Sequence, residues 1–124
     1  MSKPKFAFDL FIRDDYGNQY YLKFYLTTYA TGHTLLAANC TTDGTWWEPY
    51  CIISKDFPDD WHYDDCHQIF VDVNNIGVKL YMALVGKGIL RQTGIKILSG
   101  FCEYPLCYIN EHWYKALPKK GGLG

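Results

Sequence analysis

Two runs of aromatic and β-branched residues near the start of the chain restrict its fold more than any other feature. Residues 5–13 (KFAFDLFIR) alternate between apolar and polar positions, and residues 19–29 (QYYLKFYLTTY) are dense in residue types that favour strands. Between them, residues 14–18 form a turn cluster in which Gly17 supplies the positive φ that a tight turn requires. The pattern therefore predicts a β-hairpin and, with it, an antiparallel sheet.

The rest of the chain extends this sheet and adds helices. Five further segments have the composition of strands: residues 34–41, 46–54, 68–73, 89–99 and 104–109. Pro49 lacks an amide proton, so the strand 46–54 is expected to lie at an edge or to bulge there. We expect an α+β fold, with a mainly antiparallel sheet of five to six strands, one central helix (about 76–86) and a short C-terminal helix within residues 110–117.

Length and residue usage restrict the organisation of the chain and its compartment. With 124 residues the chain fits a single α+β domain, which we expect at residues 1–117, followed by a mobile tail at residues 118–124. The first ten residues contain no apolar core of a signal peptide. Five cysteines are an odd number with irregular spacing, which is a poor disulfide framework. We therefore expect a cytoplasmic protein that does not cross a membrane.

Two segments resemble a known family. Residues 70–75 (FVDVNN) and residues 99–105 (SGFCEYP) resemble the "DTNN" and "SGFCTYP" segments of a family of small uncharacterised proteins, a domain of unknown function. Members of that family resemble cargo of plasmids, conjugative elements and phages of anaerobic bacteria. The resemblance implies a mobile-element context, but it implies no known activity and no functional residues.

The net charge of −1 conceals a strong segregation of charge along the chain. Residues 56–73 contain six Asp and no Lys or Arg, whereas residues 74–124 contain seven basic residues and two acidic ones. Residues 56–65 (DFPDDWHYDD), which we call the acidic-aromatic loop, interleave carboxylates with large aromatic side chains. Such a loop can occupy a basic, nucleic-acid-binding groove, because carboxylates replace phosphates and aromatic side chains anchor the contact. The predicted partner-binding residues are Asp56, Asp59, Asp60, Trp61, Tyr63, Asp64 and Asp65.

Patterns for metal binding and catalysis are weaker. Cys66, Cys102 and Cys107, with nearby His, leave zinc binding open, but the two-residue spacing of a zinc knuckle is absent. Cys66 and His67 are neighbours, and consecutive side chains of a strand point to opposite faces, so a nucleophile and its base are not predicted there. The sequence therefore predicts no catalytic residue, no metal site and no cofactor, and hence no enzyme.

Two functional hypotheses follow from different classes. The first is a non-enzymatic interaction module of a mobile element, for example an inhibitor of a host defence nuclease with an anti-CRISPR-like action, whose protein partner has a basic nucleic-acid-binding surface. A sequence pI of about 6.4 disfavours direct binding of nucleic acid. The alternative is a protein that binds a small nucleotide-like molecule in a pocket lined by Trp46, Trp47 and Tyr50. The expected edge strand near Pro49 also leaves a homodimer open.

Overall fold

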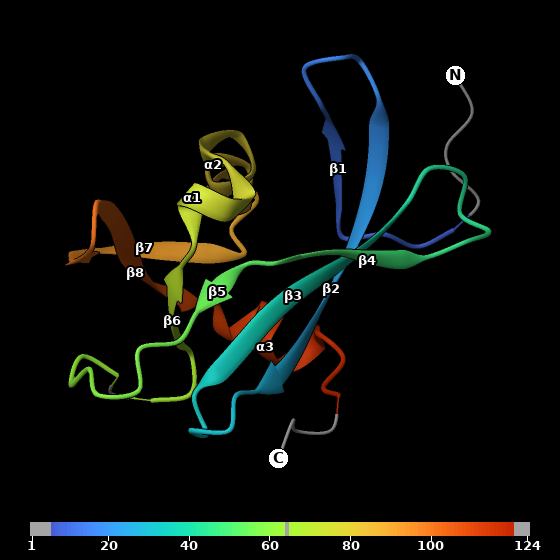
Figure 1. Cartoon of the computed structure of the whole chain (residues 1–124). Helices are drawn as coiled ribbons and strands as arrows, with labels where there is room; N and C mark the ends of the chain where they lie inside the picture. The colour runs from blue at the N-terminus through green and yellow to red at the C-terminus, as the bar shows by residue number, and fades with distance from the viewer. Residues whose placement is uncertain (1–5, 64, 121–124) are drawn as a thin grey trace.

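The computed structural model describes residues 6–63 and 65–120, which form two antiparallel sheets and three short helices (Figure 1). The first sheet has the order β1 (Leu10–Arg13), β2 (Gln19–Thr28), β3 (Thr34–Thr41) and β4 (Glu48–Ile52). The second has the order β5 (Ser54–Lys55), β6 (Gln68–Val71), β8 (Cys102–Ile109) and β7 (Leu90–Ser99). The helices are α1 (Val73–Ile76), α2 (Val78–Gly86) and α3 (Glu111–Ala116).

The α+β class is confirmed, but the prediction of one sheet with five to six strands is wrong. The two sheets diverge at Ile53, a buried residue at which the predicted strand 46–54 leaves the first sheet and enters the second. The Ile53 amide donates a hydrogen bond to the Leu36 carbonyl, and the Asp72 amide donates to the Ile53 carbonyl, each over 2.8 Å. Alternation along a strand does not specify the strand's partner, so the sequence pattern could not reveal this change of sheet.

The predicted hairpin is present as β1 and β2, although its first strand begins at Leu10 rather than at residue 5. The Asp14 carboxylate accepts hydrogen bonds of 2.9 Å from the amides of Tyr16 and Asn18, and Gly17 has a φ of 84°. Pro49 lies in β4 at the edge of its sheet, and the register with β3 shifts next to it because Tyr50 has no partner between Ala38 and Asn39, as the prediction of an edge or a bulge allowed.

The single central helix is also corrected. Residues 73–86 form two helices, α1 and α2, which are separated at Gly77. Gly77 has a φ of 88°, a conformation that glycine adopts without steric cost and that interrupts helical geometry. The apolar stripe of α2 is buried as predicted through Leu80 and Leu84, and α3 lies within the predicted segment 110–117.

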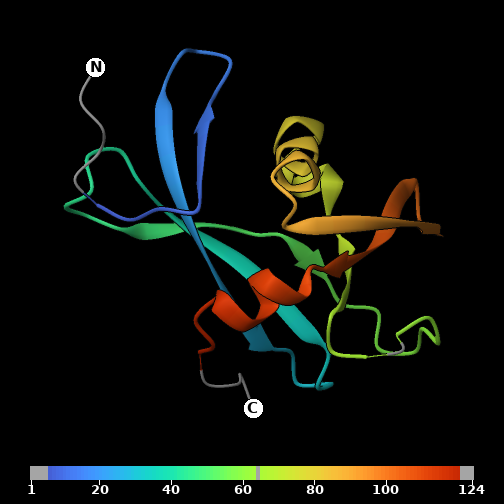
Figure 2. The same ribbon diagram turned by 180° about the vertical axis from the view of Figure 1, so that it is seen from behind.

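Both sheets and α2 contribute to one buried core. It includes Leu22, Phe24 and Leu36 from the first sheet, Ile69, Val71 and Ile109 from the second, and Leu80 and Leu84 from α2. After α3 the chain returns to β2 (Figure 2), where Leu26 donates to the Pro118 carbonyl over 2.9 Å and accepts from the Lys120 amide over 2.8 Å. Residues 118–120 of the expected tail thus lie along β2, and residues 121–124 lie outside the described residues. In the part of the chain that the structure describes, no helix is long and apolar enough to cross a bilayer.

Candidate functional site

The acidic-aromatic loop connects β5 to β6 (Figure 1), and two of its carboxylates contact histidines and are largely buried. Asp56 Oδ1 lies 2.6 Å from His33 Nδ1, and its other oxygen accepts a hydrogen bond of 2.8 Å from the Thr31 hydroxyl. Asp60 Oδ1 lies 2.7 Å from His62 Nδ1 and accepts a 2.8 Å hydrogen bond from the His62 amide. The Asp56 and Asp60 side chains are 13% and 15% exposed, so each carboxylate mainly meets its histidine rather than solvent.

The aromatic side chains of the loop fasten it to the core through Phe70, a fully buried residue of β6. Phe57, Tyr63 and His62 each place a ring edge-to-face against Phe70, with centroids 5.4, 5.2 and 6.4 Å away. Tyr63 also stacks on His33 at 3.7 Å, and its hydroxyl accepts a hydrogen bond of 3.2 Å from the Phe57 amide. Partial burial raises the pKa of Tyr63 to about 12. Tyr63 therefore supports the loop from within.

Trp61 lies on the outside of the loop. Its side chain is 81% exposed, yet its indole stacks on the His62 imidazole with ring centroids 4.0 Å apart and planes 23° apart. The Asp60 carboxylate lies 2.7 Å from His62 Nδ1, so the indole stacks on an imidazole that is itself held by a neighbouring side chain.

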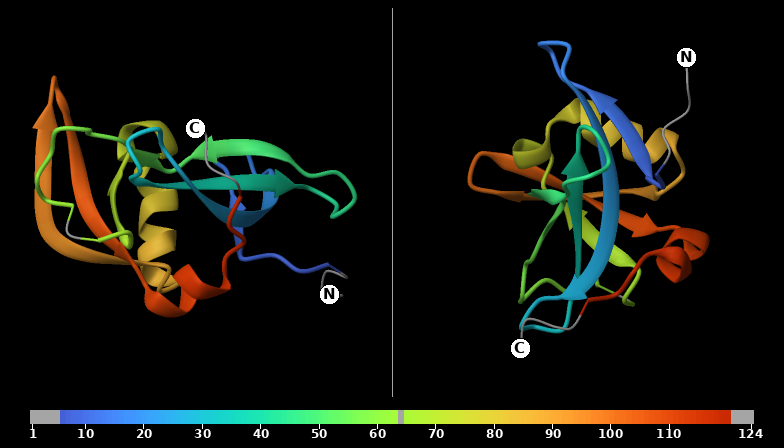
Figure 3. Two further views of the ribbon diagram at one scale, coloured as in Figure 1. Left: turned by 90° about the horizontal axis from the view of Figure 1, so that it is seen from below. Right: turned by 90° about the vertical axis from the view of Figure 1, so that its right-hand side faces the viewer.

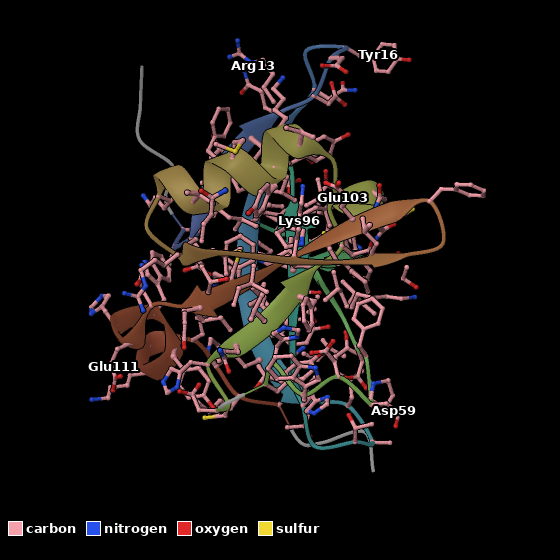
Figure 4. The ribbon with its side chains drawn as sticks, turned by 90° about the vertical axis from the view of Figure 1, so that its left-hand side faces the viewer. Arg13, Tyr16, Asp59, Lys96, Glu103 and Glu111 are labelled. Carbon is pink, nitrogen blue, oxygen red and sulfur yellow. The ribbon has the colours of Figure 1, made fainter. Side chains whose placement is uncertain are left out.

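The remaining carboxylates of the loop differ in exposure. Asp59 is exposed and makes no hydrogen bond or ion pair with the residues that the structure describes; Figure 4 shows it at the end of the molecule remote from Arg13 and Tyr16. The Asp65 side chain is 51% exposed. Asp64 was also predicted as a partner-binding residue, but it lies outside the described residues.

Cys66 and His67 are brought together, contrary to the sequence prediction. Cys66 Sγ lies 3.8 Å from His67 Nδ1, because both residues belong to a turn before β6 and not to a strand. The Asp65 carboxylate accepts a 2.7 Å hydrogen bond from the His67 amide and closes this turn. On the other side of the imidazole, Glu111 Oε2 lies 3.9 Å from His67 Nε2. A hydrogen bond with Cys66, assisted by burial, raises the pKa of Tyr114 to about 12.

The other cysteines lie apart from this turn. Cys102 and Cys107 belong to β8, and the buried Cys107 thiol lies 3.6 Å from the Tyr81 hydroxyl. Burial raises the pKa of the Cys107 thiol. Among residues 6–63 and 65–120, no group of three or more His, Cys, Asp or Glu side chains is placed to hold a metal ion.

The three residues of the predicted ligand pocket do not share one cavity. Tyr50 lines a cavity beside α2, and neither Trp46 nor Trp47 lines that cavity. Trp46 is 75% exposed, whereas Trp47 is half-buried, with the Lys23 ammonium 4.8 Å from its ring centroid. The cavity beside α2 therefore includes Tyr50 but neither tryptophan of the predicted pocket.

Two supporting residues, His33 and His62, were not predicted. The local signal for His62 is an Asp-x-His pattern that occurs twice, at residues 60–62 and 65–67, and in both copies the Asp carboxylate accepts a hydrogen bond from the His amide. His33 lies in the turn before β3, and no sequence pattern links it to Asp56. Comparison of the chain with family models, with curated proteins and with solved structures gave no match.

Proposed function

We propose that this chain is a non-enzymatic protein-interaction module that binds a partner with a basic surface through the acidic-aromatic loop. The observation that carries the proposal is the position of Trp61, which is 81% exposed and supported by the His62 ring. Tryptophan is enriched among the residues that dominate binding energies at interfaces. An indole that is already supported in the free protein loses less conformational freedom on binding.

The charges around Trp61 indicate the chemistry of the partner. Asp59 is exposed, and Asp65 is 51% exposed although it lies 3.4 Å from His67, whereas Asp56 and Asp60 are largely buried against their histidines. We therefore assign Asp59, Trp61 and Asp65 to the contact surface, and Asp56, Asp60 and Tyr63 to its support. Exposed carboxylates at the rim of an interface accelerate association with a basic partner and make it sensitive to salt.

A basic surface that accepts carboxylates and an aromatic side chain is also suited to nucleic acid. The specific form of the proposal is therefore competition: the loop occupies a nucleic-acid-binding groove, as an inhibitor of a defence nuclease would. This form agrees with the mobile-element context that the family resemblance implies.

The test is a tagged pull-down from a bacterial lysate, treated with nuclease and read by mass spectrometry, with wild type and the variant Trp61→Ala. We expect Trp61→Ala to lower affinity for the captured protein by about 30-fold or more, as truncation of an interface tryptophan commonly does. The double variant Asp59→Asn/Asp65→Asn should weaken association at low salt and have little effect at high salt.

Two matched controls lie at the other end of the molecule. Trp46→Ala removes an equally exposed tryptophan, and Asp15→Asn removes an exposed carboxylate of the hairpin turn. Both should retain the partner. The proposal would be contradicted if Trp61→Ala still captured the partner, or if Trp46→Ala lost it to the same extent. It would also be contradicted if an oligonucleotide that binds the partner did not release this protein from it.

A further inference from the structure

Three surface cavities of similar volume, about 470–490 Å³, differ in the chemistry of their walls. One, beside β5, contains the carboxylates of both Asp56 and Asp72. Another, between α2 and the β7–β8 hairpin, contains Lys96, but Glu103 lies 3.1 Å from its ammonium; Figure 4 shows the two side chains together. The third lies between the β1–β2 hairpin and α2, and it combines apolar walls with a cation, Arg13, that makes no ion pair with the residues that the structure describes.

This third cavity, which we call the hairpin cavity, has a floor that belongs to the core. Leu80 of α2 is buried, and Ile12 and Ala83 are half-buried and pack against the core. One larger side chain, Tyr50, forms a wall and is 40% exposed, and its ring lies 5.9 Å from that of Tyr20. The hairpin cavity therefore presents apolar and aromatic surface that a flat, apolar group could cover.

The rim carries two cations and two carboxylates, which differ in their partners. Lys79 Nζ lies 3.7 Å from Asp15 Oδ1, so these two charges offset each other. The Asp14 carboxylate accepts the hydrogen bonds that form the hairpin turn, and these bonds lower the pKa of Asp14 although desolvation opposes them. Arg13 has no ion pair with the residues that the structure describes, and Figure 4 shows it near the tip of the hairpin.

We propose that the hairpin cavity binds a small aromatic molecule with a single anionic group, which pairs with Arg13 while its ring lies beside Tyr50 over the apolar floor of Ile12 and Ala83. A guanidinium recognises a carboxylate or a phosphate equally through paired N–H donors. The volume of about 470 Å³ lies within the range of roughly 300–1,000 Å³ that small-molecule sites occupy. This site goes beyond the proposed function, since it shares no residue with the acidic-aromatic loop.

The experiment is a titration of the ¹⁵N-labelled full chain, followed by amide NMR shifts, with three probes that share one ring system. The probes are 2-naphthoate, 2-naphthyl phosphate and the neutral 2-naphthol. We expect saturable shifts at Gly77, which lines the cavity, with a dissociation constant of about 1 mM or tighter for the better anion. The neutral probe should bind about tenfold more weakly. The ratio of the two anions distinguishes a carboxylate ligand from a phosphate ligand.

Two variants and one control locate the site. Arg13→Gln should weaken both anions by about tenfold and leave 2-naphthol unchanged. Ala83→Leu should fill the cavity and abolish binding of all three probes, with the dispersed spectrum showing that the fold is retained. Arg91→Gln is the matched control, because Arg91 lies on β7, over the Tyr108 ring, away from the cavity.

The proposal is overturned if no probe gives a saturable shift at Gly77 up to about 5 mM, a concentration that would detect fragment-level affinity. It is also overturned if Arg13→Gln binds the anions as wild type does, or if Ala83→Leu leaves binding intact. Because Trp61 takes no part in the titration, failure here and failure of the partner-binding test are separate results.

Discussion

Two exposed tryptophans at opposite ends of β3 differ in what lies beneath them. Trp61 is in the loop that precedes β6, Trp46 is in the turn that precedes β4, and Figures 1 and 3 show the two segments far apart. Their exposures are similar, 81% and 75%. Trp61 stacks on His62, whereas Trp46 has no ring contact among the residues that the structure describes.

The turn around Trp46 supports its backbone and the neighbouring indole. Asp43 accepts hydrogen bonds from the Thr45 amide and hydroxyl, over 2.9 and 2.7 Å, and this shapes the turn. Trp47, not Trp46, packs against Phe6 and Lys23. Exposure alone therefore does not identify a binding anchor, and the support of the exposed ring distinguishes the two sites.

The largest expected effect comes from removing the core residue beneath the acidic-aromatic loop. Phe70→Ala should destabilise the protein by about 3–5 kcal/mol, because it leaves a cavity where three rings of the loop meet. Urea unfolding followed by circular dichroism measures the change. The rate of amide hydrogen exchange should rise most in the acidic-aromatic loop and least in the turn 42–47. Equal increases in the two segments would contradict the conclusion that Phe70 supports the loop in particular.

A smaller effect is expected from removing the carboxylate that holds His62. Asp60→Ala should cost about 1–2 kcal/mol, since it removes the partner of a half-buried imidazole and of the His62 amide. In a chain labelled with 5-fluorotryptophan, the ¹⁹F resonance of Trp61 should move toward that of Trp46, with each assigned by a Trp→Phe variant.

The matched control for this change is Asp59→Ala, one residue away. Asp59 is exposed and makes no hydrogen bond or ion pair with the described residues, so its removal should alter stability by less than about 0.5 kcal/mol and leave the Trp61 resonance in place. If Asp60→Ala and Asp59→Ala shift the Trp61 resonance equally, the Asp60 carboxylate does not position Trp61.

The smallest effect on stability is expected at the cysteines of the two regions, although their reactivities should differ widely. Cys66 is exposed beside His67, whereas burial raises the pKa of Cys51 in β4 to about 11. At pH 8, roughly one Cys51 thiol in a thousand is therefore ionised. Iodoacetamide, followed by mass spectrometry, should modify Cys66 first and Cys51 at least about a hundredfold more slowly in the native protein.

The control for this labelling is Cys66→Ser. It should remove the fast phase and change the free energy of unfolding by less than about 0.5 kcal/mol. A fast phase that survives in this variant would show that another thiol is the accessible one.

Local patterns in the sequence predicted the elements well and their partners poorly. The hairpin turn at residues 14–18, the edge position of Pro49 and the buried stripe of α2 all follow from local sequence, and each is present. The change of sheet at Ile53 and the break at Gly77 were missed, because the first depends on hydrogen bonds to Leu36 and Asp72 and the second on a single positive φ.

For the candidate site, too, local sequence predicted the segment but not the contacts of its side chains. The composition of residues 56–65 identified a segment that interleaves acidic and aromatic side chains, but it could not show which of them face outward. The structure separates Asp59, Trp61 and Asp65 from the inward-directed Asp56, Asp60 and Tyr63. That separation required His33, which lies 23 residues before Asp56 along the chain.

The sequence by itself determined the strands, the turns and the concentration of negative charge in one loop, since these depend on residue type and on spacing over a few positions. The tertiary structure alone decided that Asp56 meets His33, that rings of the loop pack on Phe70, and that Arg13 lies beside an apolar cavity without an ion pair to the described residues. The physical reason is that burial and pairing depend on contacts between segments distant in sequence, and periodicity within a segment carries no information about those contacts.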